Sequence, residues 1–211
     1  WVTKTRIGLI VNNDELDIVT EIERMAKKCF DSPVNTYKHK RASPKTTYYQ
    51  VDRSHAAKML AFLNEKRVPD LILQSGNSVV ASFLRWLYEG DGTVFSKGRG
   101  RTSVSLKSNN IELLRDVQIL LLRFGIHSRI LWDSKPRRAK IKGREIISGE
   151  NGSLMIRRSE SIIKFWKHVG FVSKKKILKL EDTVKYAKSH IHRIHRKMTE
   201  KIVQINRLQP Q

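Results

Sequence analysis

The feature that most constrains this sequence is an internal duplication. The segment TRIGLIVNNDELDIV, residues 5–19, aligns with TSVSLKSNNIELLRD, residues 102–116, at a constant offset of 97. A second pair, VDRSHAAKMLAFL from residue 51 and IRRSESIIKFWKH from residue 156, follows in the same order at an offset of 105. Self-similarity of this kind predicts two copies of one unit of roughly 95 residues, folded on the same plan.

Each copy is expected to contain the same short series of elements. In the second copy, polar and apolar residues alternate over 102–107, which predicts a strand, and Asn109-Asn110 predicts a turn and helix cap. A helix with one apolar stripe follows and closes at Gly125. A hairpin over 128–157, with its basic residues in an inner loop, and a helix over 160–168 that ends near Gly170 complete this copy. The first copy is expected to contain a strand over 6–10, a helix over 14–30, a hairpin over 37–51 and a helix over 54–64.

The expected fold class is therefore α+β, with two pseudo-symmetric αββαββα units. The first unit spans residues 1–75 and lacks its leading helix, and the second spans 76–180 with a leading helix over 78–92. Residues 181–211 have no counterpart in the duplication and are expected to form a basic C-terminal helical extension, with a helix over 182–208.

Charge is the strongest compositional signal. Lys and Arg number 42 against 20 Asp and Glu, for a formal net charge of +22. Such an excess attracts polyanions, and the usual one is nucleic acid. The basic residues are interleaved with periodic apolar residues, which disfavours a tail-like protein, and no amphipathic basic helix stands alone to favour a membrane surface.

Cysteine usage and hydropathy give weaker expectations about the compartment. The single cysteine, Cys29, rules out an internal disulfide and suits a reducing intracellular compartment, either a prokaryotic cytoplasm or an organelle, rather than secretion. Cys29 itself is expected to be a core residue near a helix end. No apolar stretch is long enough to predict a membrane span.

Strand alternation separates the side chains that face the helices from those on the open face. Residues expected to face inward are Ile7, Leu9, Tyr49, Val51, Val104 and Leu106. A sheet of suitable width can enter the major groove of DNA, so the open face and the basic loops are the expected DNA surface. An ordinary solvated face is the alternative for any single residue. The candidate DNA-contacting residues are Lys4, Arg6, Lys38, Lys40, Arg41, Tyr48, Gln50, Arg99, Arg101, Ser103, Ser105, Lys107, Arg129, Lys135, Arg137, Arg138, Lys140, Lys142 and Arg144.

The segment SVVASFLRWLYEGDGTV, residues 78–94, contains the candidate for chemistry. Its apolar helix ends at Gly90-Asp91-Gly92, where the free carbonyl groups of a helix C-terminus carry partial negative charge. A carboxylate there is unfavourable unless a cation neutralises it, and a divalent metal would take oxygen ligands from Asp91 and the Gly90 carbonyl. The alternative is a Gly-capped helix followed by a turn aspartate.

The segment FLRWLYEGDG, the preceding KRVP and the duplication together resemble the LAGLIDADG homing endonucleases, especially their intein-associated branch. The resemblance covers residues 5 to about 180 and implies a saddle-shaped DNA-binding sheet. It also implies hydrolysis of phosphodiester bonds in double-stranded DNA at a long recognition site, with Mg²⁺ or Mn²⁺ as cofactor. Short 3′ overhangs and mobility of a host intein or intron are further implications of the resemblance.

The resemblance also assigns roles to individual residues. Asp91 matches a metal-binding catalytic acid, Lys66 of EKRVP matches an assisting lysine, and in SKKKILKL we favour Lys175 over Lys174 and Lys176. The family packs two motif helices side by side, each with one acid. The first motif is missing from this sequence, so we expect it from a preceding segment or a second chain. Arg85 and Trp86 depart from the small residues that the motif usually has for close helix contact.

Three alternatives remain open at this point. The same fold could bind nucleic acid without cleaving it, as an intron maturase or a DNA-binding regulator does. An intein origin predicts flanking splice junctions, and the final residues NRLQPQ lack the expected His-Asn. The histidines of SHIHRIHRK, namely His190, His192 and His195, fit a basic helix better than a metal site.

Overall fold

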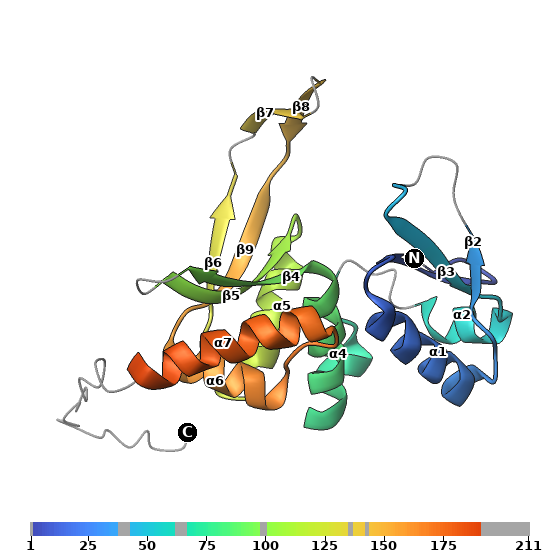
Figure 1. The fold of residues 1–211 in the computed structure, drawn as a ribbon, viewed down its shortest axis with the longest axis horizontal. Helices are drawn as coiled ribbons and strands as arrows, with labels where there is room; N and C mark the ends of the chain where they lie inside the picture. The colour runs from blue at the N-terminus through green and yellow to red at the C-terminus, as the bar shows by residue number, and fades with distance from the viewer. Residues whose placement is uncertain are drawn as a thin grey trace, which may run out of the picture.

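The chain folds into two units of helices and antiparallel sheets that lie side by side (Figure 1). The structure is a computed structural model that describes residues 2–37, 43–61, 67–97, 101–134, 137–141 and 144–190. In each unit the helices lie on one side of the sheet and leave the opposite face open (Figure 1). The expected α+β class is confirmed. Among the described residues, no helix combines the length and apolarity needed to cross a bilayer.

The first unit is a three-stranded sheet with two helices. Its strands have the order β1-β3-β2, and a small cluster of Val11, Ile18, Val19, Ile22 and Tyr49 joins the sheet to α1. The elements are β1 (Ile7–Asn12), α1 (Leu16–Phe30), β2 (Asn35–Tyr37), β3 (Thr46–Val51) and α2 (Ser54–Met59).

The second unit is larger and contains the main core. Its sheet has the order β4-β5-β9-β6, and the hairpin β7-β8 extends away from the sheet beyond β6 and β9 (Figure 1). The core joins this sheet to α4, α5, α6 and α7. The elements are α3 (Asp70–Leu73), α4 (Asn77–Asp91), β4 (Gly92–Lys97), β5 (Arg101–Ser108), α5 (Ile111–Leu122), β6 (Arg129–Asp133), β7 (Arg137–Ile141), β8 (Arg144–Ser148), β9 (Asn151–Ile156), α6 (Ser159–His168) and α7 (Lys174–His190).

The sequence alignment of the two copies agrees with the strand pairing in both sheets. It does not agree with where the first helix of each copy begins. Ile7 pairs with Val51, and Val104 pairs with Ile156, as the offsets of 97 and 105 predict. Helices α1 and α5, however, begin at Leu16 and Ile111, so the alignment at 97 is two residues out of step within the helix. The physical reason is a strand-to-helix connection that is longer in the first copy.

Helix ends in the second unit follow their sequence signals. The Asn110 side chain accepts hydrogen bonds from the backbone amides of Glu112 and Leu113, which confirms the expected cap. Gly125 and Gly170 follow α5 and α6 with positive φ angles of 65° and 67°, a conformation that glycine adopts without strain.

Three expectations about the elements were wrong. The inner loop of the second hairpin forms β7 and β8. The C-terminal helix begins at Lys174, not at residue 182, and packs Leu180, Val184 and Ala187 into the core, so its first part belongs to the second unit. Cys29 is exposed, because the buried stripe of α1 ends at Ala26.

The segment before α4, residues 67–76, is hydrogen-bonded to Asp116 of α5 and to Arg123, which directly follows that helix. The Arg67 guanidinium donates to the Asp116 carboxylate at 2.8 and 3.1 Å, and the Val68 amide donates to the same carboxylate at 3.3 Å. Further along, Arg123 donates to the carbonyl of Ser75 at 2.9 Å. Since α4 begins two residues after Ser75, these contacts fix where that helix starts.

Candidate active site at the end of helix α4

Helix α4 places Asp91 at its last position, directly before strand β4. Val80, Leu84 and Tyr88 recur every four residues and are fully buried, so one stripe of the helix is embedded in the core. A side chain at Gly92 would collide with the backbone of Tyr88, so only glycine permits this immediate turn from helix to strand. The burial of α4 leaves Gly90 and Asp91 exposed at the helix end.

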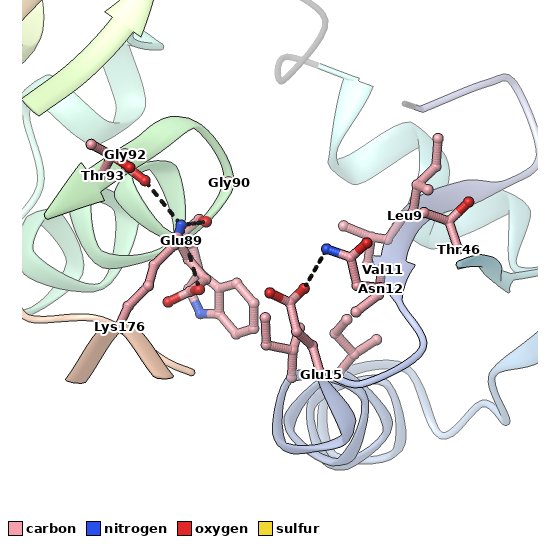
Figure 2. A pocket seen from close by; sticks show the side chains of 14 residues that line it. Leu9, Val11, Asn12, Glu15, Thr46, Glu89, Gly90, Gly92, Thr93 and Lys176 are labelled. Atoms are coloured by element: carbon pink, nitrogen blue, oxygen red, sulfur yellow. Dashed lines mark hydrogen bonds and ion pairs between the residues drawn. The ribbon is translucent and has the colours of Figure 1, made fainter. Parts of the chain in front are cut away.

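Lys176 binds the carbonyl groups at this same helix end. Its ammonium group donates to the carbonyl oxygen of Tyr88 at 3.4 Å. It also donates to the carbonyl oxygens of Gly92, at 3.0 Å, and of Glu89 (Figure 2). A cation at a helix C-terminus is favoured, because it satisfies free carbonyls and offsets the partial negative charge there. The α4 end therefore has a protein cation on its backbone oxygens beside an exposed acid.

Glu89 makes the reverse contact with helix α7. Its buried carboxylate accepts from the amides of Val172 at 2.7 Å and Ser173 at 3.1 Å, and from the Ser173 hydroxyl at 2.8 Å. The amide groups at a helix N-terminus favour a negative charge in the same way. Each helix thus caps the other: α4 supplies the carboxylate for α7, and α7 supplies the lysine for α4.

The first unit also contacts this end of α7. The Asp17 carboxylate, from α1, accepts from the Lys174 amide at 2.5 Å. Trp86, on α4, packs against the small apolar cluster of the first unit. The end of α7 and one face of α4 therefore connect the two copies.

A pocket of about 440 Å³ lies between the units at this point (Figure 2). Figure 2 shows Glu15 of the first unit on one side, hydrogen-bonded to Asn12, and Glu89 with Lys176 on the other. Asp91 does not line this pocket, and it lies at its border because both neighbours, Gly90 and Gly92, do. Residues of the two units that line the pocket are Leu9, Ile10, Val11, Asn12, Glu15, Ile18, Ile22, Thr46, Trp86, Glu89, Gly90, Gly92, Thr93 and Lys176.

The groups at the α4 end fit a hard divalent cation as one part of a shared site. Asp91 offers an exposed carboxylate, and open space surrounds the Cβ position of Gly90. Mg²⁺ is usually held by one or two carboxylates, with substrate phosphates and water completing its coordination. Within the described part of the chain, no group of three or more His, Cys, Asp or Glu side chains could hold a metal alone.

The three lysine candidates in α7 have different surroundings, and Lys174 lines the same small pocket as Lys175. Lys175, the residue we favoured from sequence, is exposed and lines a smaller pocket with Asp14, Glu15 and Asp17. Lys176, the next residue along the chain, binds the carbonyl groups at the end of α4. Lys66 lies outside the described residues.

Several candidate DNA-contacting residues are on the open side of the sheets. Lys4, Arg6, Lys107 and Arg129 are exposed. Arg6 pairs with Asp52 at 3.1 Å, and Asp52 also accepts from Gln50 and Asn35, which lowers the pKa of the Asp52 carboxyl. Arg101, Arg137, Arg138, Lys140 and Arg144 have their backbones in β5, β7 and β8. Lys38, Lys40, Arg41, Arg99, Lys135 and Lys142 lie outside the described residues.

The expected exposure was wrong at Ser103, Ser105 and Leu9, and Ile7, also expected to face inward, is only half-buried. Ser103 and Ser105 are buried, because β5 is a central strand and larger neighbours such as Phe95 and Met155, directly across from them, cover these small side chains. Leu9, expected to be buried, is 40% exposed. Tyr49, Val51, Val104 and Leu106 are buried as expected.

Sequence reasoning missed Glu89 and Asp17, and gave Trp86 only a steric role. The signal for Glu89 was present, since a carboxylate two residues before Asp91 at the same helix end requires the same neutralisation. Asp17 had no comparable signal, because its partner lies 157 residues away. His192 and His195 lie outside the described residues.

Comparison with known proteins finds a family match within the second unit and a similar fold in solved structures. Residues 78–170 match the family model of the LAGLIDADG-like domain. The solved structure of I-DmoI in complex with DNA and Ca has a TM-score of 0.57 at 15% identity, covering 86% of this chain and 89% of that chain. The homing endonuclease I-WcaI bound to its DNA recognition sequence has a TM-score of 0.56 at 14% identity, covering 85% and 79%.

Curated relatives are long proteins with unlike names. A glutamine–fructose-6-phosphate aminotransferase of Methanocaldococcus jannaschii is 27% identical over 63% of this chain and 11% of that protein. A Thermococcus DNA polymerase is 30% identical over 57% and 7%, and a Nostoc replicative DNA helicase DnaB is 25% identical over 95% and 24%. The chain thus spans a quarter or less of the length of these relatives.

Proposed function

We propose that this chain is a site-specific double-stranded DNA endonuclease dependent on Mg²⁺ or Mn²⁺. Its residues 78–170 match the LAGLIDADG-like domain, and its fold resembles those of I-DmoI and I-WcaI bound to DNA. The observation that carries the proposal is the exposed Asp91 at the end of the buried helix α4, beside Lys176. The net charge of +22 and the open sheet faces support a DNA partner.

Asp91 and the carbonyl of Gly90 would hold the metal, which when bound would activate water and stabilise the leaving oxygen of a phosphodiester. The chain's own residues have simpler tasks. Lys176 and the Glu89 carboxylate lock α4 against α7 and so hold the Asp91 backbone at the border of the pocket. Exposed Lys107 and Arg129 would bind and orient DNA on the sheet.

A second acid is part of the proposal. The first unit has no counterpart of α4 among the described residues, and Leu9 and the pocket beside it are open where that counterpart would pack. We place the second motif helix in a segment outside this sequence or in a second chain. Its acid would complete a site shared with Asp91.

The relatives favour an origin as an inserted segment. An aminotransferase, a polymerase and a helicase have no common activity that a shared segment of this size would serve. A mobile element, such as an intein within a host protein, accounts for similar segments in unlike proteins. Residence in a reducing intracellular compartment remains a prediction of the single cysteine.

The experiment begins with selection of bound duplexes from a random DNA library at physiological salt, followed by incubation with Mg²⁺. We expect the wild-type protein, with the second motif helix present from a longer chain or a partner chain, to cut the enriched duplex in both strands. Asp91→Asn should retain binding and slow cleavage by about a thousandfold, since metal stabilisation amounts to several kcal/mol and each 1.4 kcal/mol is tenfold. Asp182→Asn, an exposed carboxylate on α7, is the matched control and should cut like wild type.

Two outcomes contradict this function. Double-strand cutting by Asp91→Asn at the wild-type rate would remove Asp91 from the chemistry. Tight, salt-sensitive binding of an enriched sequence without any cutting would favour the second candidate, a DNA- or RNA-binding protein of the same fold. Asp91 is the exposed carboxylate at the α4 end, while Glu89 is buried and bound to the start of α7. Among the described residues no cluster of three or more His, Cys, Asp or Glu side chains could hold a metal, and this keeps the second candidate in view.

A further inference from the structure

A row of apolar and aromatic side chains crosses the open face of the first sheet. Strand register places Ile10 opposite Tyr48, and Tyr48 opposite Tyr37, so the three lie in one line across β1, β3 and β2. The two tyrosine rings are in contact, with centroids 5.1 Å apart. Ile10 is 53% exposed and Tyr37 is 38% exposed. This face lies opposite the helices, so the row is not part of the unit's core.

The equivalent row of the second sheet has different chemistry. There Lys107 lies opposite Ser153, and Ser153 opposite Leu131. The exposed apolar residues of that sheet, Phe95 and Leu131, stand in different rows. A continuous apolar row is therefore a property of the first unit and is absent at the same register of the second.

The dimensions of the row match one face of the DNA major groove. Neighbouring strands are about 4.8 Å apart, so three strands span roughly 10 Å, against a groove about 12 Å wide. Side chains on one face recur about every 6.8 Å along a strand, which corresponds to about two base pairs. Exposed Lys4 and Lys45 come shortly before β1 and directly before β3, near opposite ends of the β1–β3 ladder, and add positive charge that would attract phosphates.

We propose that Ile10, Tyr48 and Tyr37 read the 5-methyl groups of thymine, so that the half-site under the first unit requires T·A pairs at one or two adjacent positions. The inference rests on the proposed function and names the base chemistry of one half of its target. Thymine is the base that presents an apolar group in the major groove, and apolar side chains can distinguish it only through that group. Tyrosine pairs suit this role because few rotatable bonds are fixed on contact.

The test uses the duplex enriched from a random library and replaces thymine with uracil in one half at a time, which removes only the methyl groups. We expect uracil in one half to weaken binding about fourfold per contacted methyl group. In the triple variant Ile10→Ser/Tyr37→Ser/Tyr48→Ser this sensitivity should disappear, because no apolar side chain of the row remains. Leu131→Thr, at the register position of Tyr37 in the second sheet, should leave it unchanged. Thermal unfolding of each variant establishes that it is folded.

The outcomes separate this inference from the function beneath it. If no duplex is enriched by the wild-type chain, the proposed function itself fails. If a duplex is enriched but neither half responds to uracil, the function stands and the thymine-reading row is overturned. Uracil sensitivity that persists in the triple variant, or that is lost in Leu131→Thr, also overturns it, because the methyl contact would then lie elsewhere.

Discussion

The two copies have the same strand register but differ in what covers their sheets. Leu9 and Leu106 occupy the same register position, opposite Tyr49 and Leu154, yet Leu9 is 40% exposed and Leu106 is 1% exposed. In the second unit α4 and β4 lie against β5, whereas β1 is an edge strand of its described sheet. The same sequence pattern therefore specifies the sheet in both copies. How far the inner face of each sheet is buried depends on whether a helix such as α4 covers it.

The largest expected effect comes from replacing the two equivalent leucines, one in each sheet, with alanine. Leu106→Ala should lower the free energy of unfolding by about 3 kcal/mol, because a fully buried leucine loses its contacts and leaves a cavity. Leu9→Ala should cost about 1 kcal/mol or less, since water already reaches the side chain. Urea denaturation followed by far-ultraviolet circular dichroism measures both.

If both variants lose the same free energy of unfolding, the proposed difference in burial between the two sheets is contradicted. A loss of about 3 kcal/mol in Leu9→Ala would show that the first sheet is as deeply covered as the second.

Much of the fold was predictable from sequence because its signals are local. Alternation of polar and apolar residues gave β5, the Asn110 side chain caps α5, and glycine ends α5 and α6. Errors arose where a distant contact decides the outcome. Ser173, a residue type favoured at N-caps, directly precedes α7, but its hydroxyl donates to Glu89 and does not cap the helix. The Glu89 and Asp17 carboxylates bind the backbone amides of Ser173 and Lys174 at this helix start.

A second prediction concerns the reciprocal caps between α4 and α7 in the second unit. Lys176→Met should lower the free energy of unfolding by about 2 kcal/mol, because three backbone carbonyls lose a charged donor. Lys175→Met, at an exposed neighbour, should change it by less than about 0.5 kcal/mol. Thermal unfolding of both variants provides the measurement.

If Lys176→Met unfolds with the same free energy as the wild type, the Lys176 contacts do not stabilise the packing of α4 against α7, and the prediction is contradicted. Lys176→Arg is a useful companion, since it keeps the charge but changes the donor geometry, and partial recovery is the expected result.

The smallest expected effect concerns the close packing of α4. Tyr88 is fully buried against Phe165, and within the described chain its hydroxyl has no hydrogen-bond partner. Burial also raises the pKa of this phenol, so it stays neutral. Tyr88→Phe should therefore leave stability unchanged or raise it by about 1 kcal/mol. A clear loss of stability would reveal a hydroxyl contact in α4 and weaken the contrast with the uncovered first sheet.

The candidate site was predictable only in part, for a related reason. The GDG end of α4 identifies Asp91, since an acid at a helix C-terminus calls for a cation. Choosing among Lys174, Lys175 and Lys176 requires knowing which of them faces α4. Three consecutive lysines have identical side chains that point in different directions around the helix, so the sequence does not show which one does. Which face of α4 meets the first unit, through Trp86, depends on packing between copies that no local pattern encodes.

The central claim is that the second copy supplies a metal-binding acid, Asp91, which the described first copy does not match. The most direct test is Mn²⁺ uptake by the chain bound to its selected duplex, followed by electron paramagnetic resonance, in wild type and Asp91→Asn. We predict that the wild-type complex binds Mn²⁺ and that Asp91→Asn binds the duplex equally well with Mn²⁺ affinity reduced at least about tenfold. Equal Mn²⁺ affinity in the two complexes would contradict the account.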